Sequence, residues 1–130
     1  MARAYIGTSG FSYGHWSGTF YPDNLPQDEL LSFYARHFDT VELNTTFYRL
    51  PFKHMVSGWY RRSPEKFVFA LKGSRYITHR LKLSEAAGPL TRFFERAAIL
   101  KEKCGPVLWQ LPPNLRPDLT RLESFLKQLP

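Results

Sequence analysis

Polar and apolar side chains alternate in the segment VELNTTFYRLP, residues 41–51. Side chains two residues apart on a strand share a face, so Glu42 and Asn44 point to one side of the predicted strand 41–43 and the apolar side chains to the other. A carboxylate on a buried face must be paired or bind something, because an unpaired buried charge is costly. Glu42 is therefore a candidate catalytic group, and an ion pair with Lys72 on the next strand is the structural alternative.

Three further segments repeat this alternation: residues 4–8, 67–72 and 107–111. In each, one face is bulky and the other carries smaller residues that end in a polar group. The carboxyl ends of parallel strands meet at one edge of the sheet, and ligands bind at that edge in α/β folds. The polar residues expected at this edge are Ser9, Asn44, Lys72 and Gln110.

The loops after these segments add aromatic rings, cations and a histidine. Cations can hold a phosphate or carboxylate while aromatic rings wall the pocket. A lone loop histidine more commonly serves as a hydrogen-bonding residue, but histidine is also the side chain best suited to carry protons near neutral pH. We therefore take Glu42, Lys72 and His79 as candidate catalytic residues. The candidate ligand-binding residues are Ser9, Tyr13, Trp16, Asn44, Thr46, Tyr48, Arg75 and Gln110.

Helical spacing of apolar residues occurs in residues 24–38, 55–64, 90–105 and 118–129. Strands that alternate with helices predict right-handed crossovers and a parallel sheet with the helices outside. Two α/β architectures fit this order of elements: an open doubly wound sheet, or part of a (βα)8 barrel. At 130 residues we expect a single domain, residues 1–130.

The chain is basic, with a net charge of +7 and a pI near 9.8. Such a field favours anionic partners, and the first hypothesis is a small ligand that carries a phosphate or carboxylate. Nucleic-acid binding or processing through the basic, aromatic-rich loops is the alternative. A third hypothesis is a non-catalytic interaction domain, in which replacing Glu42 would alter only stability.

The sequence gives no sign of a membrane segment, because no window approaches ~20 apolar residues. Its one cysteine, Cys104, cannot form an internal disulfide and suits a reducing compartment, so we expect a cytoplasmic protein. Cys104 is expected to pack as a small apolar residue at a helix end. No phosphate loop, GxGxxG, HExxH or Gly-x-Ser-x-Gly motif occurs, and the histidines are scattered. We therefore expect neither a cofactor nor a metal site in this chain.

Four motifs together resemble the "domain of unknown function 72" family, also called YecE-like. The motifs are GTSGFSYGHWSGTFYP, VELNTTFYRLP, FVFALKGSRYITHR and GPVLWQLPP, and they occur in the family's order over essentially all of the chain. Phe11 is a mild departure, since tryptophan is more common there. The matching positions are Ser9, Gly10, Tyr13, Trp16, Glu42, Thr46, Phe47, Tyr48, Lys72, Thr78, His79, Gln110 and Pro112.

The resemblance implies a TIM-barrel-like fold but no particular activity. A (βα)8 barrel typically needs about 250 residues, and this chain offers about four βα units. The chain is thus expected to be the N-terminal half of a YecE-like barrel, with unpaired edges at its first and fourth strands. Either a missing C-terminal half or a second copy of the chain would close that barrel.

Overall fold

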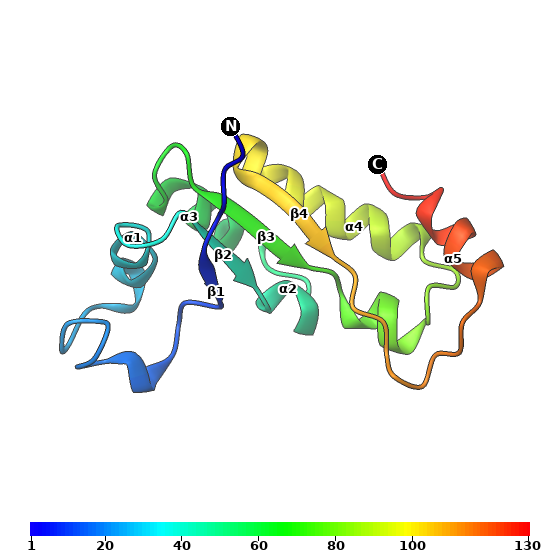
Figure 1. Cartoon of the computed structure of the whole chain (residues 1–130), viewed down its shortest axis with the longest axis horizontal. Helices are drawn as coiled ribbons and strands as arrows, with labels where there is room; N and C mark the ends of the chain where they lie inside the picture. The colour runs from blue at the N-terminus through cyan, green and yellow to red at the C-terminus, as the bar shows by residue number, and fades with distance from the viewer.

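The structure contains one sheet of four parallel strands. It is a computed structural model that describes residues 1–130. The strands pair in sequential order, β1-β2-β3-β4, as Figure 1 shows. They are β1 (Gly7–Ser9), β2 (Thr40–Leu43), β3 (Val68–Lys72) and β4 (Cys104–Leu108).

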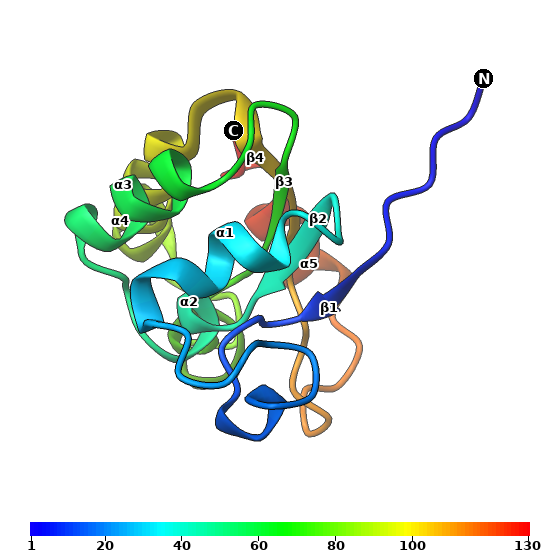
Figure 2. The ribbon, with the colours of Figure 1, turned by 90° about the vertical axis from the view of Figure 1, so that its left-hand side faces the viewer.

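Helices connect the strands. The helices are α1 (Leu30–Tyr34), α2 (Thr45–Tyr48), α3 (Lys53–Arg62), α4 (Ala87–Ala97) and α5 (Leu119–Leu126), with short 3-10 helices at Gly14–Trp16, Gln27–Glu29 and Ala98–Lys103 and a wider helical turn at Tyr76–Arg80. Figure 2 shows α1, α3 and α4 on one side of the strands. Sequential strand order with these helices on one side is the arrangement of consecutive units of a TIM-barrel-like fold and differs from a doubly wound sheet.

Alternation along the strands separates a covered face from an open one. On β2 and β3, the residues Val41, Leu43, Phe69 and Leu71 are at most 2% exposed and belong to the main core. The side chains that alternate with these four point to the opposite face of the sheet and are half-buried or exposed. We call this the open face, and its members include Ser9, Glu42, Ala70, Lys72 and Leu108.

Tyr34 joins α1 to the first two strands. Its side chain is fully buried, and its hydroxyl accepts the backbone N–H of Thr8 at 2.8 Å. The same hydroxyl donates to the carbonyl oxygen of Thr40 at 2.9 Å. Because a buried hydroxyl must be hydrogen-bonded, these contacts fix the distance between α1 and the sheet.

The fourth strand begins three residues earlier than the predicted 107–111. Gly105 permits this earlier start because it has no Cβ. A Cβ at this position would lie only 2.5 Å from the side chain of Val68 on β3 and would clash with it. Pro106 is tolerated because β4 pairs with only one neighbour, so its missing N–H leaves no ladder partner unsatisfied. Cys104 directly follows the 3-10 helix Ala98–Lys103, as expected for a residue at a helix end, and is also the first residue of β4. Burial raises the pKa of its thiol.

Other predicted elements are also shifted or shorter in the structure. The predicted strand 4–8 is Gly7–Ser9, and the predicted helix 24–38 contains only a 3-10 turn and the five-residue α1. In the predicted helix 90–105, α4 begins at Ala87 and gives way to a 3-10 segment, in which Lys101 has a φ of 51°. This non-helical residue interrupts the 3-10 segment that lies between the end of α4 and the start of β4.

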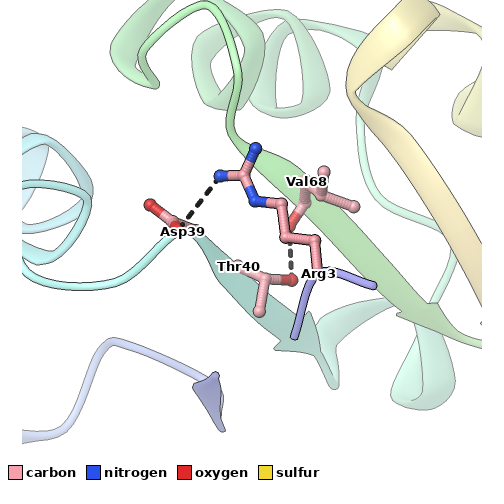
Figure 3. Close-up of polar contacts among 4 residues, drawn as sticks. All are labelled: Arg3, Asp39, Thr40 and Val68. Carbon is pink, nitrogen blue, oxygen red and sulfur yellow. Dashed lines mark hydrogen bonds and ion pairs between the residues drawn. The ribbon is translucent and has the colours of Figure 1, made fainter. Parts of the chain in front are cut away.

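The amino-terminal edge of the sheet has its own contacts (Figure 3). The hydroxyl of Thr40 donates to the carbonyl oxygen of Val68 at 2.7 Å, which ties β2 to β3. Arg3 forms an ion pair with Asp39 at 3.2 Å, but both side chains are more than half exposed. An exposed pair of this kind contributes little stability, so the edge is held chiefly by the strand ladder.

None of the helices combines the length and apolar character needed to cross a lipid bilayer.

Candidate functional site at the carboxyl ends of the strands

A hydrogen-bonded chain of side chains links β1 to β2 at the carboxyl edge. The register sets Ser9 beside Glu42. The Ser9 hydroxyl donates to Oε1 of Glu42 at 3.3 Å, and Nδ2 of Asn44 donates to the Ser9 oxygen at 2.7 Å. Oδ1 of Asn44 is buried and accepts no hydrogen bond from the protein. The three predicted site residues of β1 and β2 are thus in direct contact.

Lys72 does not pair with Glu42, contrary to the structural alternative considered for that carboxylate. The sheet register places Glu42 opposite Ala70, two residues before Lys72. The ammonium of Lys72 instead lies 4.3 Å from the ring centroid of Phe47. A ring face attracts a cation through its quadrupole, so Phe47 holds the side chain without neutralising its charge.

The short helix α2 positions Phe47 and Tyr48. Thr46 is 3% exposed, and its hydroxyl lies 2.7 Å from the carbonyl oxygen of Lys72 and 3.1 Å from that of Leu43. These contacts anchor α2 to the ends of β2 and β3. Thr46, predicted as a ligand-binding residue, therefore contacts the two strands through its hydroxyl.

His79 lies beside the Lys72–Phe47 pair. Its ring centroid is 5.3 Å from that of Phe47 in an edge-to-face arrangement. Nδ1 of His79 is 2.8 Å from the hydroxyl of Thr78, which is fully buried. The buried threonine orients the imidazole, so a cation, an aromatic ring and an imidazole meet at this edge.

Arg75 adds a second cation nearby. Its guanidinium lies 5.5 Å from the ring centroid of Tyr48, and Tyr48 is 62% exposed. Neither Arg75 nor Lys72 forms an ion pair with an acidic side chain. The edge after β3 therefore carries positive charge that the chain itself does not neutralise.

A cavity of about 480 Å³ adjoins the other side of α2. Tyr13 lies on its wall, and the tyrosine hydroxyl donates to the carbonyl oxygen of Ser9. Gly10 has a φ of +79°, and a Cβ there would meet the Tyr13 hydroxyl at 2.5 Å, so this turn requires glycine. The wall includes the predicted residues Tyr13, Asn44 and Tyr48, together with Phe11, Gln27, Met55 and Trp59.

Two predicted site residues lie apart from these contacts. Trp16 is half-buried, with its ring centroid 4.9 Å from Tyr13 and 5.8 Å from Tyr21, so it supports the first loop by packing. Gln110 lies two residues beyond the end of β4 and is exposed. The expected fourth polar residue at the sheet edge is therefore replaced by the apolar Leu108, which pairs with Lys72.

Sequence reasoning noted Phe47 and Thr78 as motif positions but assigned neither to the site. The signal for Phe47 was its place directly after Thr46, in the loop that follows a strand ending in a polar residue. For Thr78 the signal was a hydroxyl adjacent to the only loop histidine after β3. No three histidine, cysteine, aspartate or glutamate side chains gather closely enough to hold a metal ion.

Comparison with known proteins shows to which family this chain belongs. The profile of the family described as "Protein of unknown function DUF72" matches residues 5–130. The chain belongs to the DUF72 family. Among curated relatives, this DUF72 chain is 37% identical over 98 residues to the UPF0759 protein YecE of Escherichia coli strain K12. That alignment covers 75% of this chain and 36% of the relative.

Solved structures of DUF72 proteins share the fold. A DUF72 family protein of Thermotoga maritima MSB8 superposes with a TM-score of 0.78 at 29% identity, covering 95% of this chain and 50% of that one. A DUF72 family protein of Enterococcus faecalis V583 gives a TM-score of 0.69 at 23% identity over 95% of this chain and 47% of that one. The chain therefore spans about half the length of these DUF72 structures, and the predicted family and TIM-barrel-like fold are confirmed.

Proposed function

We propose that this DUF72 chain binds a small ligand bearing a phosphate or carboxylate group at the carboxyl ends of β2 and β3. The observation that carries the proposal is Lys72, which is half-buried on the open face and forms no ion pair. A partly desolvated charge without a counter-charge is unfavourable. An anionic ligand at Lys72 supplies that counter-charge.

The neighbours of Lys72 support the same assignment. Phe47 fixes the ammonium, and Arg75 over Tyr48 offers a second cation. Exposed aromatic surface at Tyr48 provides a wall for the apolar part of a ligand. In this proposal Lys72 and Arg75 bind the anionic group, with Tyr48 and the hydrogen-bonded Ser9 and Asn44 beside it.

Proton transfer is assigned in this proposal to two groups that flank the anion. His79 is oriented by the hydroxyl of Thr78, and Glu42 is oriented by Ser9. A general acid or base acts only when it is held within hydrogen-bond reach of the proton that moves. In this proposal His79 transfers protons on the side of the site next to Phe47, and Glu42 does so on the side next to β1.

Calorimetric titration with inorganic phosphate and with acetate tests the proposal. We expect saturable binding to the wild-type chain and a loss of roughly tenfold or more in affinity for Lys72→Met, because a charge-assisted hydrogen bond is removed. Lys66→Met is the matched control, since Lys66 is exposed and precedes the opposite, amino-terminal end of β3. Absence of saturable binding, or equal losses in both variants, would refute the proposal.

A second function, binding of single-stranded nucleic acid, is favoured by one arrangement. Tyr48 and Tyr76 are 62% and 46% exposed, and guanidinium groups lie 5.5 Å and 6.0 Å from their ring centroids. Exposed rings can stack bases while cations contact phosphates. Binding of this kind weakens steeply as salt rises, so an oligonucleotide affinity that is flat with ionic strength would exclude it.

A further inference from the structure

A second cavity, of about 190 Å³, lies between α2 and the start of α4. Its lining combines two arginines with hydroxyl-bearing and apolar residues. The lining residues are Thr46, Tyr48, Arg49, Leu50, Ser74, Tyr76, Pro89, Arg92 and Phe93. At about 30 Å³ per water molecule, this volume accommodates roughly six waters, or one small organic ligand.

The charged groups of this cavity are all positive. Arg49 and Arg92 line it, no carboxylate does, and neither arginine forms an ion pair elsewhere in the chain. Guanidinium groups present planar pairs of donors that match the oxygens of phosphate or carboxylate. Arg92 belongs to α4 and Arg49 directly follows α2, so two arginines from different parts of the chain, neither of them in an ion pair, line one hollow.

A hydroxyl adds a neutral donor. The oxygen of Ser74 accepts the backbone N–H of Tyr76 at 3.2 Å, which orients the side chain and leaves its proton available. The hydroxyl of Thr46 is already engaged with backbone carbonyl oxygens. Of the two aliphatic hydroxyls in the lining, Ser74 is therefore the one that can donate to an oxyanion held by the arginines.

The remaining wall is apolar. Phe93 is 3% exposed and forms the floor with Pro89, while Leu50 is 40% exposed at the rim. A free inorganic ion would leave this wall uncovered, whereas a ligand with a small apolar body would bury it. The lining thus favours a phosphate attached to a ring or short hydrocarbon over phosphate alone.

This cavity is distinct from the site at Lys72. Lys72, Phe47 and His79 are absent from its lining, and Lys72 belongs to the open face, although Tyr48 borders both this cavity and the site at Lys72. Thr46, by contrast, lines both this hollow and a smaller gap among the core residues Val56, Trp59 and Leu71, which belong to the covered side of the sheet.

We propose that the Arg49–Arg92 cavity binds a phosphate monoester with a small apolar or aromatic body. The arginines hold the phosphate oxygens, Ser74 donates to one of them, and the body rests on Pro89, Phe93 and Leu50. The proposal is independent of the one made for Lys72, because no residue that carries charge is shared between the two sites.

Titration with phenyl phosphate, phenol and inorganic phosphate tests the proposal on the complete chain. We expect phenyl phosphate to saturate a site that persists in Lys72→Met, to bind there more tightly than inorganic phosphate, and phenol not to saturate. Arg49→Gln and Arg92→Gln should each weaken binding roughly tenfold or more, since each removes charge-assisted hydrogen bonds. Arg92→Lys should restore only part of the affinity, because it keeps the charge but loses the planar pair of donors.

Two further variants make the outcome decisive. Arg61 is an exposed arginine of α3 that does not line the cavity, so Arg61→Gln should change the affinity by less than about twofold, as surface charges usually do. Lys72→Met removes the anion site proposed at Lys72, so saturable binding of phenyl phosphate should remain in this variant and be lost when Arg49→Gln is added. No saturable binding, or an equal loss in Arg61→Gln, overturns the proposal. A loss confined to Lys72→Met overturns it too, while leaving the function proposed for Lys72 intact.

Discussion

The ammonium of Lys72 lies over the ring of Phe47 at 4.3 Å, although the carboxylate of Glu42 belongs to the same face of the neighbouring strand. Glu42 instead accepts a hydrogen bond from Ser9. The two groups of opposite charge are therefore held apart by separate contacts. Held apart, both remain available to a ligand.

A double-mutant cycle on Glu42 and Lys72 tests this separation. We expect the coupling in the free energy of unfolding between Glu42→Gln and Lys72→Met to stay below about 0.5 kcal/mol, because the side chains share no contact. Urea unfolding of the four proteins measures it. A coupling of about 2 kcal/mol or more would show that the pair is a structural ion pair in solution.

Lys103 provides a stability prediction away from the site. It is 5% exposed, and its ammonium donates to the carbonyl oxygens of Tyr60 and Ser63 at 2.7 and 2.8 Å. Lys103 thus satisfies carbonyl groups at the end of α3 from the chain segment that enters β4. We expect Lys103→Met to lower the free energy of unfolding by about 1–3 kcal/mol, because buried acceptors lose their donor.

The matched control for Lys103 is Lys101→Met. Lys101 is exposed and lies two residues earlier, so its loss should change the free energy of unfolding by less than about 0.5 kcal/mol. Chemical denaturation at neutral pH distinguishes the two variants. Similar stabilities for both would contradict the role given to Lys103.

Tyr21 predicts a loss of stability in alkaline solution. Burial, and secondarily the neighbouring Tyr34, raises the pKa of Tyr21 from 10.0 to about 12. Between these values the unfolded chain releases the phenolic proton while the folded chain keeps it, so the contribution of Tyr21 is intact below pH 10 and declines as the pH rises toward 12. We expect the free energy of unfolding of Tyr21→Phe to fall less between pH 9 and pH 11.5 than that of the wild-type chain. Denaturation curves measured across this pH range test the prediction. An unchanged pH dependence in the variant would contradict the assignment.

The two outer strands predict self-association. β1 pairs only with β2 and β4 only with β3, so each presents an unpaired edge. We expect two copies to close against each other, giving a discrete dimer in light scattering and fixed tryptophan signals in near-ultraviolet circular dichroism. A stable monomer with the same fixed signals would contradict this expectation.

The sequence alone predicted which face of β2 and β3 is buried, because Val41 and Leu43 alternate with polar residues and Phe69 and Leu71 do so with smaller ones. It misplaced β4, since Gly-Pro at Gly105 is a common strand breaker and only the close approach to β3 explains why it is tolerated here. This close approach depends on where β3 lies in the folded chain, which the residues around Gly105 do not reveal.

The candidate site was predicted in part. Contacts that follow from strand register, such as Ser9 with Glu42, could be anticipated from alternation along each strand. The partner of Lys72 could not, because Phe47 reaches it through α2, a four-residue helix too short to give a helical pattern in sequence. The arginine cavity was missed for a related reason, since Arg49 and Arg92 are far apart in the chain and line one cavity only in the folded protein.

The most direct test of anion binding at Lys72 is a nuclear magnetic resonance titration of the labelled chain with inorganic phosphate. We expect saturable shifts of the backbone amides of Glu42, Phe47, Lys72 and His79, none of which lines the Arg49–Arg92 cavity. These shifts should disappear in Lys72→Met and persist in Lys66→Met. An absence of saturable shifts at these four residues, or shifts there that survive Lys72→Met, would contradict anion binding at Lys72.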